Sequence, residues 1–387
     1  MLKAEFFIQL IGASFFLILN IYLVKQGFSD PEIANFISYR FLAVMLLAFP
    51  LGFYIKGKPL KPFLMVGSFG VPIIAILLLL VLKFNMYSFL PLLFILWGAV
   101  FTIFQVSALP YIMRNASLAN QTYAISLNFA MHSFGTILSG IIIFIFGKFM
   151  HEIDEGNVLL FIASIGFFGV YYLFKIKVDI VPLENKGLHW RYYDWLLLIK
   201  AIIPTIIIAI GSGLTIPFIN LFFFHNFNID TAGFAVIGGV SSLLVAFLSL
   251  IVPKIKNRLG FKKGILYTQM TAVIALIALA STEFFKDYWW SLWLAVFCYW
   301  LRTPLMNMAA PMTSELTMNY VGKKNQEMLS AIMAAIWSGS WFLSSQIFRI
   351  LTSEGISYAY IFYITAMLYA FGVFMYYLLI SDYEKRK

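Results

Sequence analysis

Long runs of apolar residues dominate this sequence, and each is long enough to cross a lipid bilayer as a helix. A helix needs about 20 apolar residues to span the hydrocarbon core. Of the 387 residues, 62% are hydrophobic and only 11% are charged, whereas about 25% of the residues in a soluble domain are charged. A soluble chain of this composition would expose too much apolar surface to stay dissolved. The sequence therefore predicts an all-α integral membrane protein.

Twelve runs qualify as membrane spans. They cover residues 4–25, 31–55, 61–84, 88–113, 119–149, 157–176, 194–224, 230–253, 264–284, 288–313, 325–350 and 356–380. With the N-terminus inside, 20 of the 27 Lys and Arg residues fall on the cytoplasmic side, five fall outside, and Arg40 and Arg302 fall within spans. Basic residues concentrate on the cytoplasmic side of membrane proteins. We therefore predict two cytoplasmic termini, and we attribute the net charge of +10 to topology rather than to nucleic-acid binding.

The second half of the chain echoes the first. The matching pairs are Asn20 and Asn220, Asp30 and Asp230, Pro110 and Pro311, Ser126 and Ser330, and Gly135 and Gly339. Their separations drift only from 200 to 204 residues and they keep their order. Six spans separate the members of each pair, so both copies have the same orientation, as in two-bundle transporters. We predict a six-helix bundle over residues 1–176, a cytoplasmic linker over 177–193, and a second six-helix bundle over 194–387.

Two basic segments occupy equivalent places in the halves, between the second and third spans. The segment at 253–263 reads PKIKNRLGFKK, and that at 52–59 reads GFYIKGKP. Together with the six-plus-six spans, they resemble the major facilitator superfamily, whose loop reads Gly-x-x-x-Asp-Arg-x-Gly-Arg-Arg. Lys56 and Gly57 depart from that pattern, replacing the acid and the arginine of the first copy. The resemblance implies a cytoplasmic gate at Gly52, Asn257, Arg258, Gly260, Lys262 and Lys263; the alternative is simple anchoring by positive charge.

Two arginines provide the sharpest functional signal. Arg40 and Arg302 lie inside spans, where each charge costs about 2.5–3.5 kcal/mol or more. No acid lies clearly within a span, because the acids near spans fall at their ends: Glu5, Glu315 and Glu327 at the cytoplasmic side, and Asp30, Glu32 and Asp230 at the outer side. A guanidinium suits a carboxylate or phosphate through paired hydrogen bonds. We therefore expect both arginines to bind an anionic substrate; the alternative is that backbone and side-chain oxygens satisfy them.

Further polar residues lie on spans 1, 4, 7 and 10, which the family resemblance implies line the central cavity. The candidates for substrate binding are Gln9, Asn20, Gln105, Thr215 and Asn307. Such groups also commonly hydrogen-bond neighbouring helices. His132 is deep in span 5, on one helical face with Asn128 and Thr136, and is either a proton relay or an interhelical hydrogen-bonding group.

These features favour a secondary active or facilitative transporter that moves a small, anionic organic solute by alternating access. Alternatives are an exporter of neutral or apolar compounds, a membrane-embedded enzyme and a receptor on a transporter fold. We expect no enzyme activity, cofactor or metal, since no ATP-binding loop or His/Cys cluster is present. The expected partners are the solute, the bilayer and a coupling ion or counter-substrate, with the chain a monomer. Short loops and a single cysteine, Cys298, favour a bacterial inner membrane.

Overall fold

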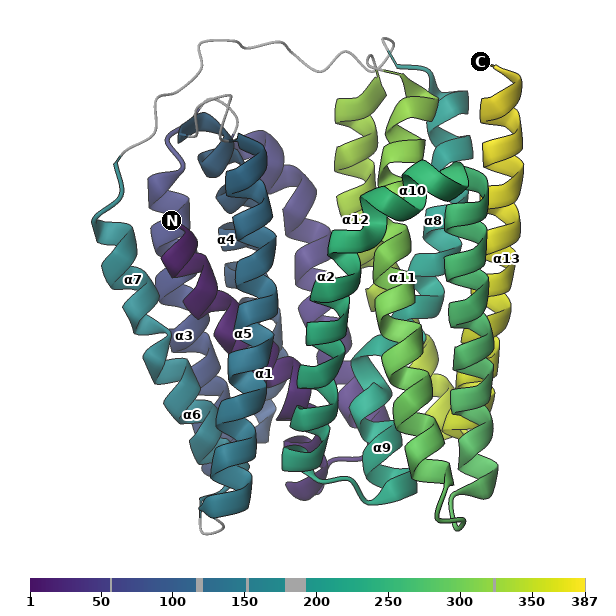
Figure 1. Ribbon diagram of the computed structural model, residues 1–387. Coiled ribbons are helices and arrows are strands. Elements are labelled where there is room, and N and C mark those ends of the chain that lie inside the picture. Colours follow the sequence, from purple (N-terminus) through teal and green to yellow (C-terminus); the bar gives the residue numbers. More distant parts are fainter. Residues whose placement is uncertain (56–57, 116–120, 151–152, 178–192, 323–324, 387) are drawn as a thin grey trace. The chain divides into compact units, whose positions relative to one another are not determined.

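The computed structural model describes the chain except for residues 56–57, 116–120, 151–152, 178–192, 323–324 and 387, and the described part is helical (Figure 1). The first helices are α1 (Leu2–Lys25), α2 (Asp30–Tyr54), α3 (Lys61–Lys83), the short η1 (Tyr87–Phe89), α4 (Leu90–Asn115), α5 (Gln121–Phe149), α6 (Glu155–Ile165) and α7 (Phe167–Phe174). They are followed by α8 (Trp195–Thr215), η4 (Ile216–Phe218), α9 (Ile219–Phe227), α10 (Thr231–Ser281), η5 (Thr282–Phe285), α11 (Ser291–Val321), α12 (Gln326–Ser353) and α13 (Tyr358–Lys385). The all-α prediction is confirmed.

The chain forms two compact units. The first contains Met1–Gly187 and Ile229–Gly239, and the second contains Leu188–Asn228 and Val240–Lys387. The start of α10 therefore belongs with the first unit and the rest of α10 with the second. The division into bundles at 1–176 and 194–387 stays a prediction, and most of the expected linker lies outside the described residues.

Ten helical segments of the described chain are long and apolar enough to cross a membrane, judged by length and composition. Neither α11 nor α12 is among them. These two helices carry many polar residues, including Arg302 and Asn307 in α11. Twelve spans and the cytoplasmic placement of both termini therefore remain predictions.

Two spans are less regular than a plain apolar run suggests. The sixth is divided at Gly166 into α6 and α7, and the seventh changes to a short 3-10 turn at η4, where Pro217 lies. In contrast, the loop expected between 253 and 264 is helical. Gly260 alone breaks that run, with φ +68° and ψ 179°. Glycine has no Cβ and adopts positive φ readily, so one residue bends α10 without a longer loop.

Small residues let the helices of each unit pack closely. In the first unit a Cβ on Gly98 of α4 would lie 2.3 Å from the Arg40 carbonyl oxygen of α2. In the second unit a Cβ on Gly213 of α8 would lie 2.7 Å from the Ser344 Cβ of α12. Small residues at such crossings are typical of membrane helices, where close van der Waals packing replaces the hydrophobic effect.

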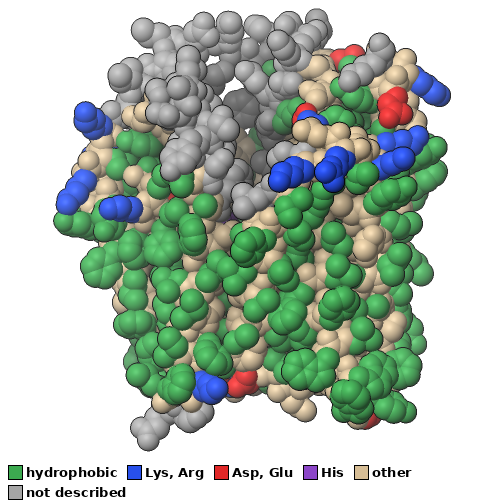
Figure 2. Space-filling view, viewed as in Figure 1, with side chains coloured by type: hydrophobic (Ala, Val, Ile, Leu, Met, Phe, Trp, Pro, Cys, Tyr) green, Lys and Arg blue, Asp and Glu red, His purple; other side chains and the backbone are tan. Residues whose placement is uncertain are grey.

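Apolar side chains also cover the outside of the protein. Figure 2 shows hydrophobic side chains over the middle of one face, with Lys and Arg side chains gathered near one end. Large exposed residues include Phe247, Trp293 and Met367, at 66%, 68% and 72% exposure. An apolar belt of this kind matches a bilayer, and a basic band at one end is what the positive-inside rule predicts.

Candidate functional site

Arg302 is enclosed in the second unit. Its side chain on α11 is only 4% exposed. Nη2 donates a hydrogen bond of 2.7 Å to the Tyr369 hydroxyl of α13, and the guanidinium carbon lies 5.5 Å from the centroid of that ring. Nε is buried and has no hydrogen-bond partner. Among the described residues no carboxylate pairs with Arg302, so a buried positive charge is left with spare donor capacity.

Tyr369 owes its position to a glycine on a third helix. A Cβ on Gly211 of α8 would lie 3.0 Å from Tyr369 Cε1. The ring is 1% exposed and therefore held firmly beside Arg302. Sequence reasoning missed this residue, because one tyrosine among 21 carries no signal until the helices are packed.

Arg40 lies in a different environment, in the first unit. Its guanidinium carbon is 4.4 Å from the centroid of the Trp97 ring and 5.6 Å from that of Phe101, both on α4. Nε is buried without a hydrogen-bond partner. Aromatic faces attract a cation, more strongly when water is excluded. Arg40 is therefore held by aromatic rings, and no carboxylate of the described chain pairs with it.

The other predicted substrate-binding residues divide by exposure. Gln105 and Asn307 are exposed, whereas Gln9, Asn20 and Thr215 are buried. Thr215 donates a hydrogen bond of 2.9 Å to Thr365 on α13, and Asn307 donates one of 2.9 Å to the Thr303 carbonyl of its own helix. Thr215 thus matches the interhelical alternative, and the substrate role of all five remains a prediction.

The predicted gate segment has an ion pair that sequence reasoning did not foresee. Asn257, Arg258 and Lys263 are exposed, and a Cβ on Gly52 would meet no atom within 4 Å. Lys262 Nζ lies 4.9 Å from the Tyr377 ring centroid. The ion pair joins Lys256 of α10 to Glu315 of α11.

His132 is exposed on α5, and its carbonyl accepts a hydrogen bond of 3.1 Å from Thr136. His132 and Thr136 are therefore in contact on one helical face, through the backbone carbonyl of His132. The role of the imidazole as a proton relay is still a prediction.

The expectation that buried acids are absent is wrong. Glu5 on α1 is 2% exposed. Its Oε1 accepts a hydrogen bond of 2.7 Å from Gln9 Nε2, and its Oε2 is buried without a partner. Position in the sequence placed Glu5 at a helix end, but the helices around α1 enclose that end. The sequence signal was the i, i+4 spacing of Glu5 and Gln9, which puts both on one helical face.

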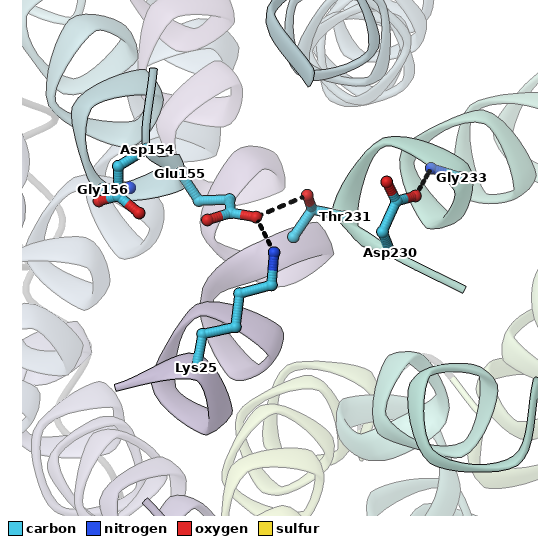
Figure 3. A network of polar contacts seen from close by, with 7 residues as sticks. All are labelled: Lys25, Asp154, Glu155, Gly156, Asp230, Thr231 and Gly233. Atoms are coloured by element: carbon cyan, nitrogen blue, oxygen red, sulfur yellow. Dashed lines mark hydrogen bonds and ion pairs between the residues drawn. The ribbon is translucent and has the colours of Figure 1, made fainter. Parts of the chain in front are cut away.

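A polar network joins three helices of the first unit (Figure 3). Lys25 at the end of α1 forms an ion pair with Glu155 at the start of α6. The Thr231 hydroxyl at the start of α10 donates to the same carboxylate oxygen, at 3.1 Å. Asp154 caps α6 through the Gly156 amide at 3.1 Å, and burial raises the pKa of that carboxyl. The network fixes the first turn of α10 against α1 and α6.

Comparison with known families bears directly on this arrangement. The family model described as Major Facilitator Superfamily matches residues 4–345. This chain belongs to the major facilitator superfamily. The resemblance noted from the spans and the basic segments is thereby confirmed. No curated protein sequence matches the chain closely enough to count as a relative.

Solved structures of superfamily transporters share the fold. A variant of the nucleoside transporter NupG aligns with a TM-score of 0.77 at 15% identity, covering 98% of each chain. The D-xylose–proton symporter gives 0.75 at 11% identity, covering 97% of this chain and 96% of that one. A bacterial homologue of the iron transporter ferroportin, in an inward-facing state, gives 0.71 at 13% identity, with 98% and 97% covered. Likeness at such low identity shows the fold alone.

Proposed function

We propose that this chain is a secondary transporter that moves a small organic anion across a membrane by alternating access. Superfamily membership supplies the transporter class. The similar structures are a nucleoside transporter, a sugar symporter and a homologue of an iron transporter, so the substrate class must be argued from the residues of this chain.

The observation that carries the proposal is the state of Arg302. Its guanidinium is buried, its Nε is unpartnered, and its one hydrogen-bond acceptor among the described residues is a neutral hydroxyl on Tyr369. Leaving a buried charge without a counter-charge costs several kcal/mol. A bound carboxylate or phosphate would supply the counter-charge and accept two parallel hydrogen bonds.

Tyr369 has a definite part in this proposal. By accepting from Nη2 it fixes the plane of the guanidinium and leaves Nε and the remaining donors for the solute. Such preorganisation reduces the ordering cost of binding. Arg40, held over Trp97 in the first unit, is the second cation that we assign to the anionic solute.

The test is flux through the purified full chain in proteoliposomes. Radiolabelled dicarboxylates, sugar phosphates and nucleoside monophosphates form the anion panel, and uncharged sugars and nucleosides form the neutral panel. We expect uptake of a member of the anion panel. Arg302→Gln should raise the half-saturating concentration of that anion at least about tenfold, which corresponds to about 1.4 kcal/mol.

Arg349→Gln is the matched control, because Arg349 is also on a helix of the second unit but only partly buried. We expect its half-saturating concentration to stay within about twofold of the parent value, as surface changes commonly do. Uptake restricted to the neutral panel, or an unchanged Arg302→Gln protein, would overturn the anionic assignment in favour of a carrier of neutral compounds.

A further inference from the structure

We propose that Glu5 is a proton-binding site that couples transport to proton movement. The inference rests on the proposed transport function but concerns a separate residue, in the other unit from Arg302. In one state Glu5 carries a proton on Oε2, and in the other it releases that proton to water as H⁺. No other bond changes, and the charge of the site alternates between zero and minus one.

The first support is the environment of the carboxyl. Glu5 is 2% exposed, its Oε1 accepts from Gln9 Nε2 at 2.7 Å, and its Oε2 has no partner. Gln9 is itself 2% exposed. A carboxylate buried with a single hydrogen bond is strongly disfavoured, whereas the protonated acid carries no net charge. The site is therefore built for the protonated form in this conformation.

The second support is that no cation of the described residues pairs with Glu5. Helices α2, α3, α5, α6 and α7 all pack on α1. The described titratable side chains on these helices and on α1 are Lys3, Tyr22, Lys25, Asp30, Glu32, Tyr39, Arg40, Tyr54, Lys61, Lys83, His132, Lys148, Glu155, Tyr171 and Tyr172. None of them forms an ion pair or hydrogen bond with Glu5 in the described structure.

Lys3 of α1 and Lys61 of α3 have other contacts. Lys3 Nζ lies 5.2 Å from the centroid of the Tyr172 ring. Lys61 Nζ donates to the Ile176 carbonyl at 2.6 Å. The Met1 amino group, at the start of the same helix, has its pKa lowered by burial and then by Lys3. The experiment must therefore distinguish titration of the Met1 amino group from titration of Glu5.

The helix dipole does not account for the buried acid. Glu5 lies in the first turn of α1, where a negative charge gains a small stabilisation. That stabilisation reaches at most about 2 kcal/mol, in partly buried geometries, and is smaller than the cost of an uncompensated buried carboxylate. A carboxylate that served only to stabilise the start of the helix could remain at the surface. The dipole therefore does not explain why neighbouring helices enclose Glu5.

The neighbouring helices provide polar groups beside the same turn. A Cβ on Gly169 of α7 would lie 3.3 Å from the Ala4 carbonyl and 3.5 Å from the Ser68 hydroxyl of α3. That hydroxyl is buried without a hydrogen-bond partner. On α5, a Cβ on Gly135 would lie 3.0 Å from the Gln9 carbonyl carbon, and His132 precedes Gly135 by one turn. The Ser68 hydroxyl of α3 and the backbone of α5 at Gly135 therefore lie beside the turns of α1 that carry Glu5 and Gln9.

The first turn of α1, which carries Glu5, also has an exposed side chain. Lys3, two residues from Glu5, is exposed. A conformation that exposes this turn to water would let Glu5 ionise. A conformation that encloses this turn would stabilise the protonated form of Glu5. Protonation thus shifts the balance between two conformations by the difference in proton affinity that they impose.

The first experiment detects the proton itself. Infrared difference spectra of the purified full chain in proteoliposomes are recorded across a pH titration. We expect the carbonyl stretch of a protonated carboxyl to persist at neutral pH, where a free Glu, with a pKa of about 4.3, is ionised. Glu5→Gln should remove that band, and Glu384→Gln, at an exposed glutamate of α13, should retain it. A band that survives Glu5→Gln, or no band in the parent protein, overturns the proposal.

The second experiment asks whether the proton moves the protein, which a merely structural acid would not do. Cys298 is replaced by Ala, and a cysteine replaces the exposed Ser314 of α11 as a reporter for maleimide labelling. Labelling rates at pH 6 and pH 8 are divided by the rates for the same protein after denaturation at the same pH. This division corrects for the pH-dependent ionisation of the cysteine thiol. We expect the corrected rate to change at least about threefold in the parent and to be constant in Glu5→Gln, as for a population shift.

The outcomes separate this inference from the proposed function. Neither experiment contains a solute of the anion panel, so failure of that panel leaves both experiments interpretable. A corrected rate that keeps its pH dependence in Glu5→Gln assigns the effect to another group, such as the Met1 amine, and overturns the proposal. Choline chloride is the control for sodium chloride. A corrected rate that responds to sodium chloride but not to choline chloride or pH would indicate a sodium site and would also overturn the proposal.

Discussion

At the scale of single residues, Arg302 and Tyr369 act as a pair. Arg302→Lys keeps the charge but loses the planar fork, so we expect the half-saturating concentration of the transported anion to rise about tenfold. Tyr369→Phe removes the acceptor of Nη2 and leaves the charge, so we expect a smaller rise of about three- to tenfold, the value of one hydrogen bond. Concentration-dependent uptake in proteoliposomes measures both. A Tyr369→Phe protein more impaired than Arg302→Lys would contradict the assignment of binding to the arginine.

Arg40 allows a test in which stability and binding move in opposite directions. Arg40 is partly buried against aromatic rings and has no carboxylate partner among the described residues, so replacing it with an apolar residue of similar length removes a desolvation cost. We expect Arg40→Met to raise the melting temperature or leave it unchanged, while weakening binding of the anion about tenfold. Thermal melting of the purified protein and uptake kinetics give the two readouts. A lower turnover at unchanged affinity would instead assign Arg40 to gating.

At the scale of helices, Gly98 sets the closest approach of α2 and α4. The Cβ of an alanine there would lie 2.3 Å from the Arg40 carbonyl oxygen and 3.1 Å from the Ala43 Cβ. Because backbone must move to relieve the first contact, we expect Gly98→Ala to destabilise the fold by about 1–3 kcal/mol. Gly52→Ala is the control: it meets nothing within 4 Å and should gain about 0.5–1 kcal/mol from helix propensity. Equal melting temperatures for the two variants would refute this packing argument.

The network around Glu155 makes a prediction about α10. Removing the charge in Glu155→Gln leaves Lys25 unpaired and weakens the bond from Thr231. The pair is partly solvent-exposed, so its contribution should be modest, and we expect amide hydrogen exchange in residues 231–239 to accelerate about two- to fivefold. Glu32→Gln, at the start of α2, provides the comparison and should leave those amides unchanged. Exchange that is equal in the two variants would show that apolar packing alone holds the start of α10.

At the scale of the whole molecule, topology is the open prediction. With twelve spans, 20 of the 27 basic residues fall on one side, and this bias predicts both termini in the cytoplasm. In the Cys298→Ala background, a cysteine at Lys186 or Lys385 should react with an impermeant maleimide only in inside-out vesicles. Labelling of either site from outside intact cells would reverse the orientation or change the number of spans.

The sequence by itself determined the membrane environment, the all-helical class and the resemblance to the superfamily, because the length of apolar runs and the placement of charge are properties of the chain read in order. It also singled out Arg40 and Arg302, since a charge inside an apolar run is costly wherever the helix packs. Only the tertiary structure decided which ends of helices are enclosed and which partners each polar group finds. Glu5 is near a chain end yet buried, Tyr369 is paired with an arginine 67 residues away, and a loop expected before Gly264 is a helix bent at one glycine. Each depends on which helix packs beside which, and that is set by contacts between residues far apart in the chain.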